Sequence, residues 1–306
     1  MTIITSILNP QGTLSVAAIL AISFILGLLH GATPDEHTWP ITFSYAIGSF
    51  STRKGMKSGF AFSAGFTAQR ALLTTLGFLG LAGLYIKYNL DGPVYVIVGI
   101  AMAVAGAYIL RKKIYKHIPI DVLLGGHRHH TGNAERLAPE KAHSSDGSVP
   151  LKAAVVHGLI AGFGFGAYAA IITFILAPKV PSIWYAPLPG LMFGVGTMVM
   201  QIIFGAVFAN LTRIKKLTKE QAEQIGRGTA GNTLYYGGMF FAIIGILIIL
   251  FPAIDKIAIS TGSTIPNLDS FGVSTLLVLV VVGAIGLGNL VLGFRRMSRL
   301  ASKSRE

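Results

Sequence analysis

The chain has no cysteine among its 306 residues, and charged residues are scarce at 12%. Without cysteine there are no disulfides, thiolate metal sites or dithiol redox chemistry, so a metal site must use nitrogen and oxygen ligands. Soluble domains carry about 25% charged residues. Because hydrophobic residues make up 52% of the chain and the mean hydropathy is +0.65, the shortage of charge predicts a membrane protein.

Apolar runs of about 20 residues, the length that crosses a bilayer, recur along the whole chain. The sequence therefore predicts an all-α polytopic membrane protein with about seven transmembrane helices, or eight if the first run holds two short helices. No basic residue or cleavage site marks a signal peptide near the start, so none is expected. The apolar runs lie at roughly 14–50, 57–86, 92–110, 151–177, 188–210, 232–252 and 270–293.

The basic residues that give the net charge of +13 gather in alternate loops. Residues 51–58 carry three, 111–150 seven, 211–231 five and the tail after Gly293 five, which makes these segments cytoplasmic by the positive-inside rule. We therefore expect a protein of the cytoplasmic (inner) membrane with a cytoplasmic C-terminus and no nucleic-acid partner. The intervening loops hold only Lys87, Lys179 and Lys256.

An internal repeat indicates how the helices are organised. ILGLLHGATPDEH (25–37) aligns with KAAVVHGLIAGFG (152–164), and each His-Gly pair begins a unit of three segments. An odd number of crossings per unit inverts the second unit, a recurring transporter plan in which discontinuous helices form the site. We expect a first membrane repeat over 1–110, a cytoplasmic flexible loop over 111–150, a second repeat over 151–252, and an extra helix with a basic tail over 253–306.

The stretch HGATPDEH places two histidines and two acids within an apolar run. Asp35 and Glu36 are the only carboxylates inside any apolar segment, and ionisable groups within a membrane mark a functional path or ion site by default. His30 and His37 are two helical turns apart, about 11 Å, which is too far to share one ion on a straight helix.

Pro34 can break that helix, since proline removes a backbone hydrogen bond. A fold at residues 31–34 would bring His30, Asp35 and His37 together, and imidazole with carboxylate suits nickel, cobalt, zinc or iron. The alternative is an external turn between two helices, where such charges need no special role.

Arg70, near the middle of the run 57–86, also requires a partner. It either forms a structural ion pair with Asp35 or Glu36, or acts as a gate or an anion-binding group. Its neighbour Gln69 is a candidate neutral ligand.

Further candidates lie in the second half of the chain. His157 is as much a packing residue as a ligand, although its alignment with His30 favours a ligand. Gln201 and Asn289, within later apolar runs, are weaker candidates for the path and are typical of interhelical hydrogen bonds. Weak metal binding in the central loop would use His127, His129 and His130.

These residues resemble the nickel/cobalt transporter family, which includes nickel permeases, nickel/cobalt efflux proteins and membrane-bound urease accessory proteins. Its early His-x4-Asp-x-His signature is matched in full by His30, Asp35 and His37. VVHGLIAGFGFGA, through His157 and Gly158, is similar to a later motif of the urease-accessory branch. The resemblance covers roughly residues 20–210, and it extends to the His-bearing loop between the halves.

One departure concerns the next helix, where the family usually carries Gly-His-Ser. The equivalent stretch here reads Gly65-Phe66-Thr67, with Arg70 just beyond. A lost imidazole and an added cation leave open a different divalent metal, or a substrate other than a metal.

The leading hypothesis is a secondary transporter of divalent transition-metal ions, nickel or cobalt first, with His30, Asp35 and His37 as core ligands. Glu36 and His157 would be auxiliary or proton-coupled. No His-Glu-x-x-His or GxxxxGK[ST] motif is present, so we expect neither an enzyme nor an ATPase, and no permanently bound cofactor. The bilayer and the metal are the expected partners, with a homo-oligomer possible. Alternatives are a membrane metal-delivery accessory protein, or an exporter of a small anion or organic solute that uses Arg70.

Overall fold

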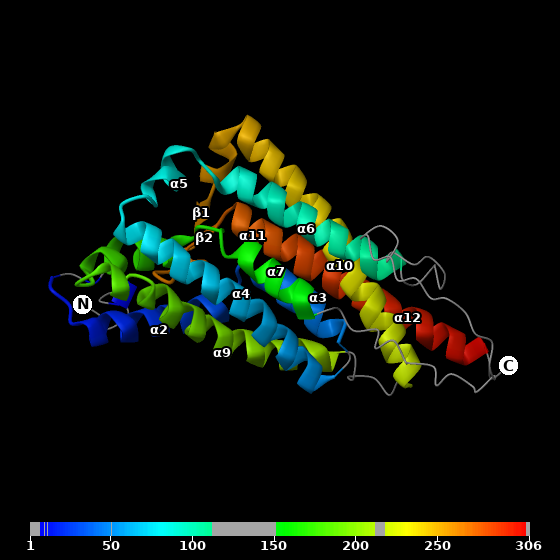
Figure 1. Cartoon of the computed structure of the whole chain (residues 1–306). Helices are drawn as coiled ribbons and strands as arrows, with labels where there is room; N and C mark the ends of the chain where they lie inside the picture. Colours follow the sequence, from blue (N-terminus) through cyan, green and yellow to red (C-terminus); the bar gives the residue numbers. More distant parts are fainter. Residues whose placement is uncertain are drawn as a thin grey trace, which may run out of the picture.

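The computed structural model describes residues 7–8, 10, 12–49, 51–111, 151–211 and 218–303. These residues form helices and one small antiparallel hairpin, β1 (Ile259–Ser260) and β2 (Ser270–Phe271), as Figure 1 shows. The α-helices are α2 (Val16–Ala32), α3 (Trp39–Ile47), α4 (Thr52–Phe78), α5 (Gly83–Lys87), α6 (Asp91–Arg111), α7 (Leu151–Ala161), α8 (Ala167–Ala170), α9 (Leu188–Asn210), α10 (Lys219–Leu250), α11 (Val273–Val278) and α12 (Gly288–Lys303). Two π-helical stretches, η2 (Ile171–Leu176) and η7 (Leu279–Leu287), and three 3-10 turns, η3 (Ala177–Lys179), η4 (Ile183–Tyr185) and η6 (Pro252–Lys256), complete the described chain.

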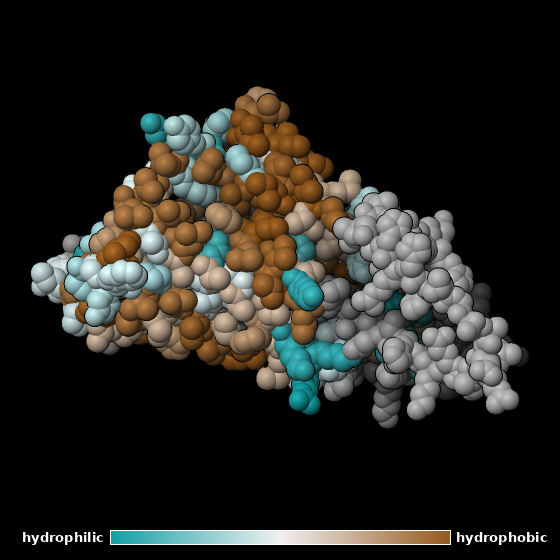
Figure 2. Space-filling view, viewed as in Figure 1, coloured by the Kyte–Doolittle hydropathy of each residue, from teal (hydrophilic) through white to brown (hydrophobic). Residues whose placement is uncertain are grey.

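Long apolar helices dominate the structure. Figure 2 shows apolar side chains over much of the visible face of the helical body, and many large hydrophobic residues are exposed, which is unusual for a soluble monomer. The prediction of an all-α membrane protein is therefore confirmed. The described stretches long and apolar enough to cross a membrane are Asp91–Arg111, Ile183–Asn210, Glu220–Leu250 and Val273–Arg299, and shorter apolar helices cover Val16–Ala32, Leu151–Ala161 and Ala167–Lys179.

The first apolar run is interrupted, as the sequence predicts. Helix α2 ends at Ala32, and α3 begins only at Trp39. Thr33 is extended, with φ −82° and ψ 148°, because a following proline, here Pro34, disfavours the helical conformation. The break starts two residues later than predicted, since Gly31 and Ala32 still belong to α2.

A second interruption lies between α7 and α8. Helix α7 ends at Ala161, and α8 begins at Ala167 after the glycine-rich stretch GFGFG. Glycine costs a helix interior about 1 kcal/mol relative to alanine, so three glycines in five residues favour a break. The aligned His-Gly segments of the two halves therefore both end in broken helices.

Helices α6 and α10 lie against each other along glycine seams (Figure 1). A Cβ atom on Gly99 would lie 2.5 Å from the Ala242 nitrogen, and one on Gly238 would lie 2.4 Å from the Ala103 nitrogen. The two backbones are thus in direct contact, as small residues allow between membrane helices. The glycines recur every seven residues at Gly92, Gly99 and Gly106 on α6 and at Gly231, Gly238 and Gly245 on α10.

The two halves also exchange their first helices. Helix α2 packs on α9 of the second half, and α7 packs on α4 of the first half, while α4 and α9 pack on each other. Each exchange uses a glycine close to an aligned histidine: Gly27 lies three residues before His30, and Gly158 directly follows His157. A Cβ on Gly27 would lie 2.0 Å from the Phe193 oxygen, and one on Gly158 would lie 1.8 Å from the Phe62 oxygen.

Replacing Gly238 with leucine should prevent α6 and α10 from closing, because the added side chain meets backbone. Overpacking typically costs about 1–3 kcal/mol or more, so the melting temperature of the purified protein in detergent should fall. Gly283→Leu in η7, which also packs on α10, is the matched control, since a Cβ there meets nothing within 4 Å. Equal melting temperatures for the two variants would contradict the close packing of α6 and α10 at Gly238.

Candidate metal centre

Four ionisable side chains lie buried at the break in the first helix. His30, Asp35 and His37 are each 4% exposed, and Glu36 is 5% exposed. His30 is on the last turn of α2, and the other three belong to the interruption before α3. Burying carboxylates and imidazoles is costly unless they are paired or hold a cation, so their contacts decide what the cluster does.

The Asp35 carboxylate organises the break. Its Oδ1 atom accepts hydrogen bonds from the backbone nitrogens of His37, at 3.0 Å, and Thr38, at 2.9 Å. Both nitrogens belong to the turn before α3, so the short polar side chain satisfies free backbone donors two and three residues on, as in an Asx-turn. The Oδ2 atom lies 3.7 Å from Nδ1 of His30, so Asp35 joins the two sides of the break.

Glu36 and His37 form the second part of the cluster. Oε1 of Glu36 lies 3.0 Å from Nδ1 of His37, and it accepts a hydrogen bond of 3.1 Å from the Tyr95 hydroxyl. The Tyr95 ring stacks on the imidazole with centroids 5.2 Å apart. The sequence gives no role to Tyr95, although a tyrosine within the apolar run 92–110 is a polar group that needs a partner.

Within the described residues, Asp35, Glu36 and His37 are the group whose geometry best fits a metal. Each offers one ligand atom, and these atoms lie within 4.8 Å of one another. Ligands of a divalent ion such as zinc sit about 2.0–2.2 Å from it, so a modest closure would bring all three to one ion. Nε2 of His37 and Nε2 of His30 have no hydrogen-bond partner. Glu36, expected as auxiliary, thus lies in the centre.

His30 lies at the edge of this group, inside an aromatic enclosure. Its ring stacks on Phe66 at 5.6 Å and contacts Phe193 at 5.1 Å and Tyr168 at 5.7 Å. Phe66 occupies the place where the resembled family carries histidine. The structure therefore brings His30 to Asp35 but surrounds its ring with carbon.

Arg70 does not form the ion pair considered from the sequence. Among the described residues, no carboxylate lies within 4.0 Å of its guanidinium. Its Nη2 donates to the Gly164 oxygen at 2.9 Å, and the guanidinium lies 4.6 Å from the centre of the Phe66 ring. Nε and Nη1 have no partner, and neither has the amide of the neighbouring Gln69, although both residues are at most 3% exposed.

The break between α7 and α8 reaches the centre through Gly164. Its backbone packs on the His37 imidazole so closely that a Cβ would lie 2.5 Å from three ring atoms. Gly164 therefore touches His37 with its α-carbon and Arg70 with its carbonyl oxygen. The glycine-rich composition predicts the break, but sequence alone does not place this glycine against His37.

His157 occupies a different position from its aligned partner. One ring nitrogen, Nδ1, shares a hydrogen bond with the hydroxyl of Tyr45 on α3, and His157 is not part of the three-residue group. This contact ties α7 to the far side of the first break and supports the packing interpretation.

Polar side chains of α9 and α10 act as interhelical links. Gln201 accepts a hydrogen bond of 2.6 Å from Thr42 Oγ1 and donates one of 3.4 Å to the Gly31 oxygen. It therefore joins α9 to both sides of the first break. Asn289 accepts a hydrogen bond of 2.8 Å from Asn232.

The loop between β1 and β2 lies over both breaks. Asn267 Nδ2 donates to Thr33 Oγ1 at 3.3 Å, and the Tyr168 hydroxyl donates to the Pro266 oxygen, also at 3.3 Å. A cavity of about 350 Å³ separates this loop from the first break and is lined by Pro34 and Trp39 among others.

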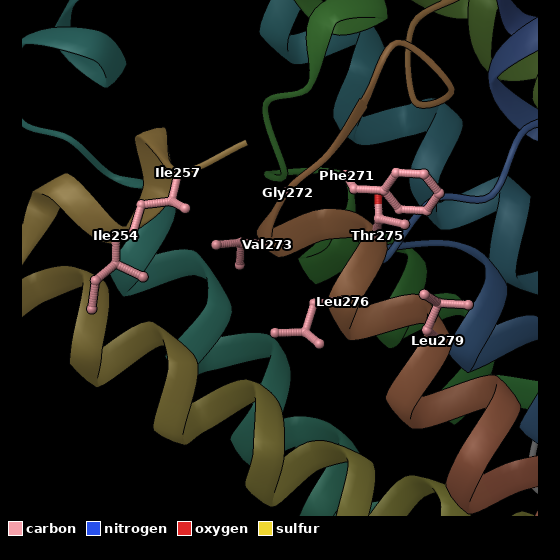
Figure 3. A pocket seen from close by; sticks show the side chains of 8 residues that line it. All are labelled: Ile254, Ile257, Phe271, Gly272, Val273, Thr275, Leu276 and Leu279. Atoms are coloured by element: carbon pink, nitrogen blue, oxygen red, sulfur yellow. The ribbon is translucent and has the colours of Figure 1, made fainter. Parts of the chain in front are cut away.

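A neighbouring cavity of about 390 Å³ lies between η6 and α11 (Figure 3). Its eight lining residues include no ionisable side chain, so it offers nothing to a metal. The loop histidines His127, His129 and His130 lie outside the described residues.

The pKa of Asp255, in η6 beyond the end of α10, depends in part on the charge of Glu36 in the centre. Burial raises the pKa of its carboxyl to about 6, and the negative charges of Asp91 and Glu36 act in the same direction. The negative charges of Asp91, Glu36 and Asp255 thus add up to a negative potential, which attracts cations.

No family model, no curated protein and no solved structure matches this chain.

Asp255→Asn should stabilise the protein at about pH 7.5. The pKa of Asp255 in the folded state, about 6, exceeds the ordinary value of 3.8, so folding is weakened as pH rises through this window and the loss persists above it. Asparagine removes that loss, and the gain should disappear below about pH 4. Melting temperatures of both proteins across this range test the expectation, and a gain independent of pH would contradict it.

Proposed function

We propose that this protein is a secondary transporter of a divalent transition-metal ion. The observation that carries the proposal is the buried group of Asp35, Glu36 and His37 in the first helix break, with His30 beside Asp35. Two carboxylates held in a membrane interior need positive charge nearby, and the described residues pair neither of them with lysine or arginine. A cation carried through the protein supplies that charge.

The ligand chemistry supports a borderline metal of the first transition row. Imidazole nitrogen and carboxylate oxygen suit nickel, cobalt, zinc and iron, whereas calcium and magnesium prefer oxygen alone. The sequence motif shared with nickel/cobalt transporters favours the first two. Since the sequence has no phosphate-binding loop motif, the proposed energy source is an ion gradient.

We further propose seven crossings built from two inverted repeats, with the C-terminus in the cytoplasm. The exchange of α2 and α7 between the halves, each packing on the second helix of the other repeat, is what a two-fold relation produces. The basic ends of α4, α6, α7 and α12 lie toward one end of the molecule (Figure 1). Trp184 and Tyr185 of η4, just before α9, are exposed, which is typical of a membrane interface.

Metal binding to the purified protein tests the proposal. In isothermal titration calorimetry with nickel, cobalt, zinc, iron(II) and manganese, the wild type should show saturable binding. His37→Ala and Asp35→Asn should each weaken binding by more than about tenfold, because each removes a ligand from a group of three. His30→Ala should act less strongly, since His30 lies at the edge.

His157→Ala is the matched control for loss of a buried imidazole, and it should leave the affinity unchanged. Uptake of the same metal into proteoliposomes, with and without a proton gradient, then separates a transporter from a protein that only binds metal. Absence of saturable binding for all five metals would refute the proposal.

The position of Gly164 gives an independent test. Gly164→Ala places a methyl group against the His37 ring and should weaken metal binding by about tenfold or more, because misplaced ligands lose affinity. Gly166→Ala, two residues along the same break, is the control, since a Cβ there meets nothing within 4 Å. Identical metal affinities for the two variants would show that the second break does not affect metal binding at the centre.

A second candidate function is the export of a small anion. Its support is the Arg70 guanidinium with two unpartnered nitrogens beside the unpartnered Gln69 amide, since buried donors without acceptors are suited to an anionic ligand. This function would be abolished by Arg70→Gln and would survive His37→Ala, the reverse of the order expected for a metal transporter.

A further inference from the structure

A polar cavity of about 200 Å³ lies between α10 and α12, far along the chain from the metal centre. Its walls are faces of two helices on which the lining residues recur at three- and four-residue spacing, as expected for one side of a helix. On α10 these are Gln224, Ile225, Gly228, Thr229 and Asn232, and on α12 they are Asn289, Leu292, Gly293, Arg296 and Met297.

The lining suits an anion. It contains the guanidinium of Arg296, the side-chain amides of Gln224, Asn232 and Asn289, and no acidic residue. Among the described residues, no carboxylate lies within 4.0 Å of Arg296. Arginine presents several N–H donors in a fork that fits phosphate oxygens.

A buried polar group in the wall lacks a partner. Thr229 is 2% exposed, and its Oγ1 has no hydrogen bond. Buried hydroxyls are nearly always satisfied, so this unpartnered hydroxyl in the wall supports a ligand in the polar cavity. Gly228 leaves further room, since a Cβ atom there meets nothing within 4 Å.

The surroundings distinguish a lipid from a free ion. Leu292 lines the cavity and is 63% exposed, and Tyr236, one turn beyond Asn232 on α10, is 54% exposed. A polar, basic pocket that continues into exposed apolar side chains matches a molecule with an anionic head and a hydrocarbon tail. Arg295 and Arg299 add positive charge on the same helix.

We propose that this cavity binds the phosphate headgroup of an anionic phospholipid, with Arg296 as the principal contact. Basic pockets between membrane helices on the cytoplasmic side are a recognised form of lipid site. The lipid would join α12 to α10 and so fix the last helix to the second half of the protein. This inference does not depend on metal transport.

Native mass spectrometry of the full chain in detergent tests the proposal, with phosphatidylglycerol and phosphatidylcholine of equal chain length. The wild type should retain one phosphatidylglycerol more tightly than phosphatidylcholine. Arg296→Gln should weaken phosphatidylglycerol binding about tenfold, the usual scale of a charge-assisted hydrogen bond. Gly228→Leu should weaken it as well, because the added side chain fills the cavity without changing the charge.

Arg295→Gln is the matched control, since it removes the same charge one residue away from a position that does not line the cavity. Its phosphatidylglycerol affinity should equal that of the wild type. Equal losses in the two arginine variants, or equal retention of the two lipids, would overturn the site in favour of diffuse surface attraction. Displacement of the lipid by millimolar inorganic phosphate would identify a free-phosphate site instead.

Discussion

The hydrogen bonds from the backbone of His37 and Thr38 to Asp35 are the interactions on which the candidate centre depends. A broken helix inside a membrane exposes N–H and C=O groups that lipid cannot satisfy, at several kcal/mol each. One carboxylate oxygen of Asp35 satisfies two of these groups in the turn before α3, and the other faces His30. The residue that stabilises the interruption is therefore also a candidate ligand. Both the helix break and the proposed metal site require a carboxylate at this position.

Close backbone packing around the break keeps it away from lipid. Gly27 lets α2 lie against the Phe193 backbone, and Gly164 lets the second break lie against His37. A side chain at either position would push apart the walls of the centre. In lipid no hydrophobic effect drives membrane helices together, and close packing at small residues takes over that role. The many glycines of this chain therefore define which helices can meet. The seven-residue glycine spacing on α6 and α10 builds a second seam by the same means.

The sequence indicates the elements of the site better than their contacts. The helix break follows from Pro34, and the clustering of Asp35 and Glu36 within an apolar run marks the centre without any structure. Tyr95 comes from α6 and Gly164 from the break between α7 and α8, and their contacts depend on packing that no local pattern encodes.

Arg70 illustrates the same limit. Opposite charges are the natural pairing to expect for a buried arginine, but its guanidinium lies over Phe66 and donates to a carbonyl oxygen. The alignment of His157 with His30 locates a second broken helix correctly, yet His157 contacts Tyr45 rather than the centre. The similarity of the two His-Gly segments thus extends to a helix break after each histidine and not to the residues at the candidate centre.

Charge balance links the two breaks in the proposed transporter. With Asp35 and Glu36 ionised and Arg70 protonated, a single net negative charge remains before the histidines are counted. A divalent ion would reverse this sign, so it would repel the Arg70 guanidinium, which itself contacts neither carboxylate. Arg70 is anchored on Gly164 of the second break, and the backbone of that glycine packs against the His37 ring. In the proposed transporter, occupation of the first break by a cation would therefore alter the forces on the second, as movement between two inverted repeats would require.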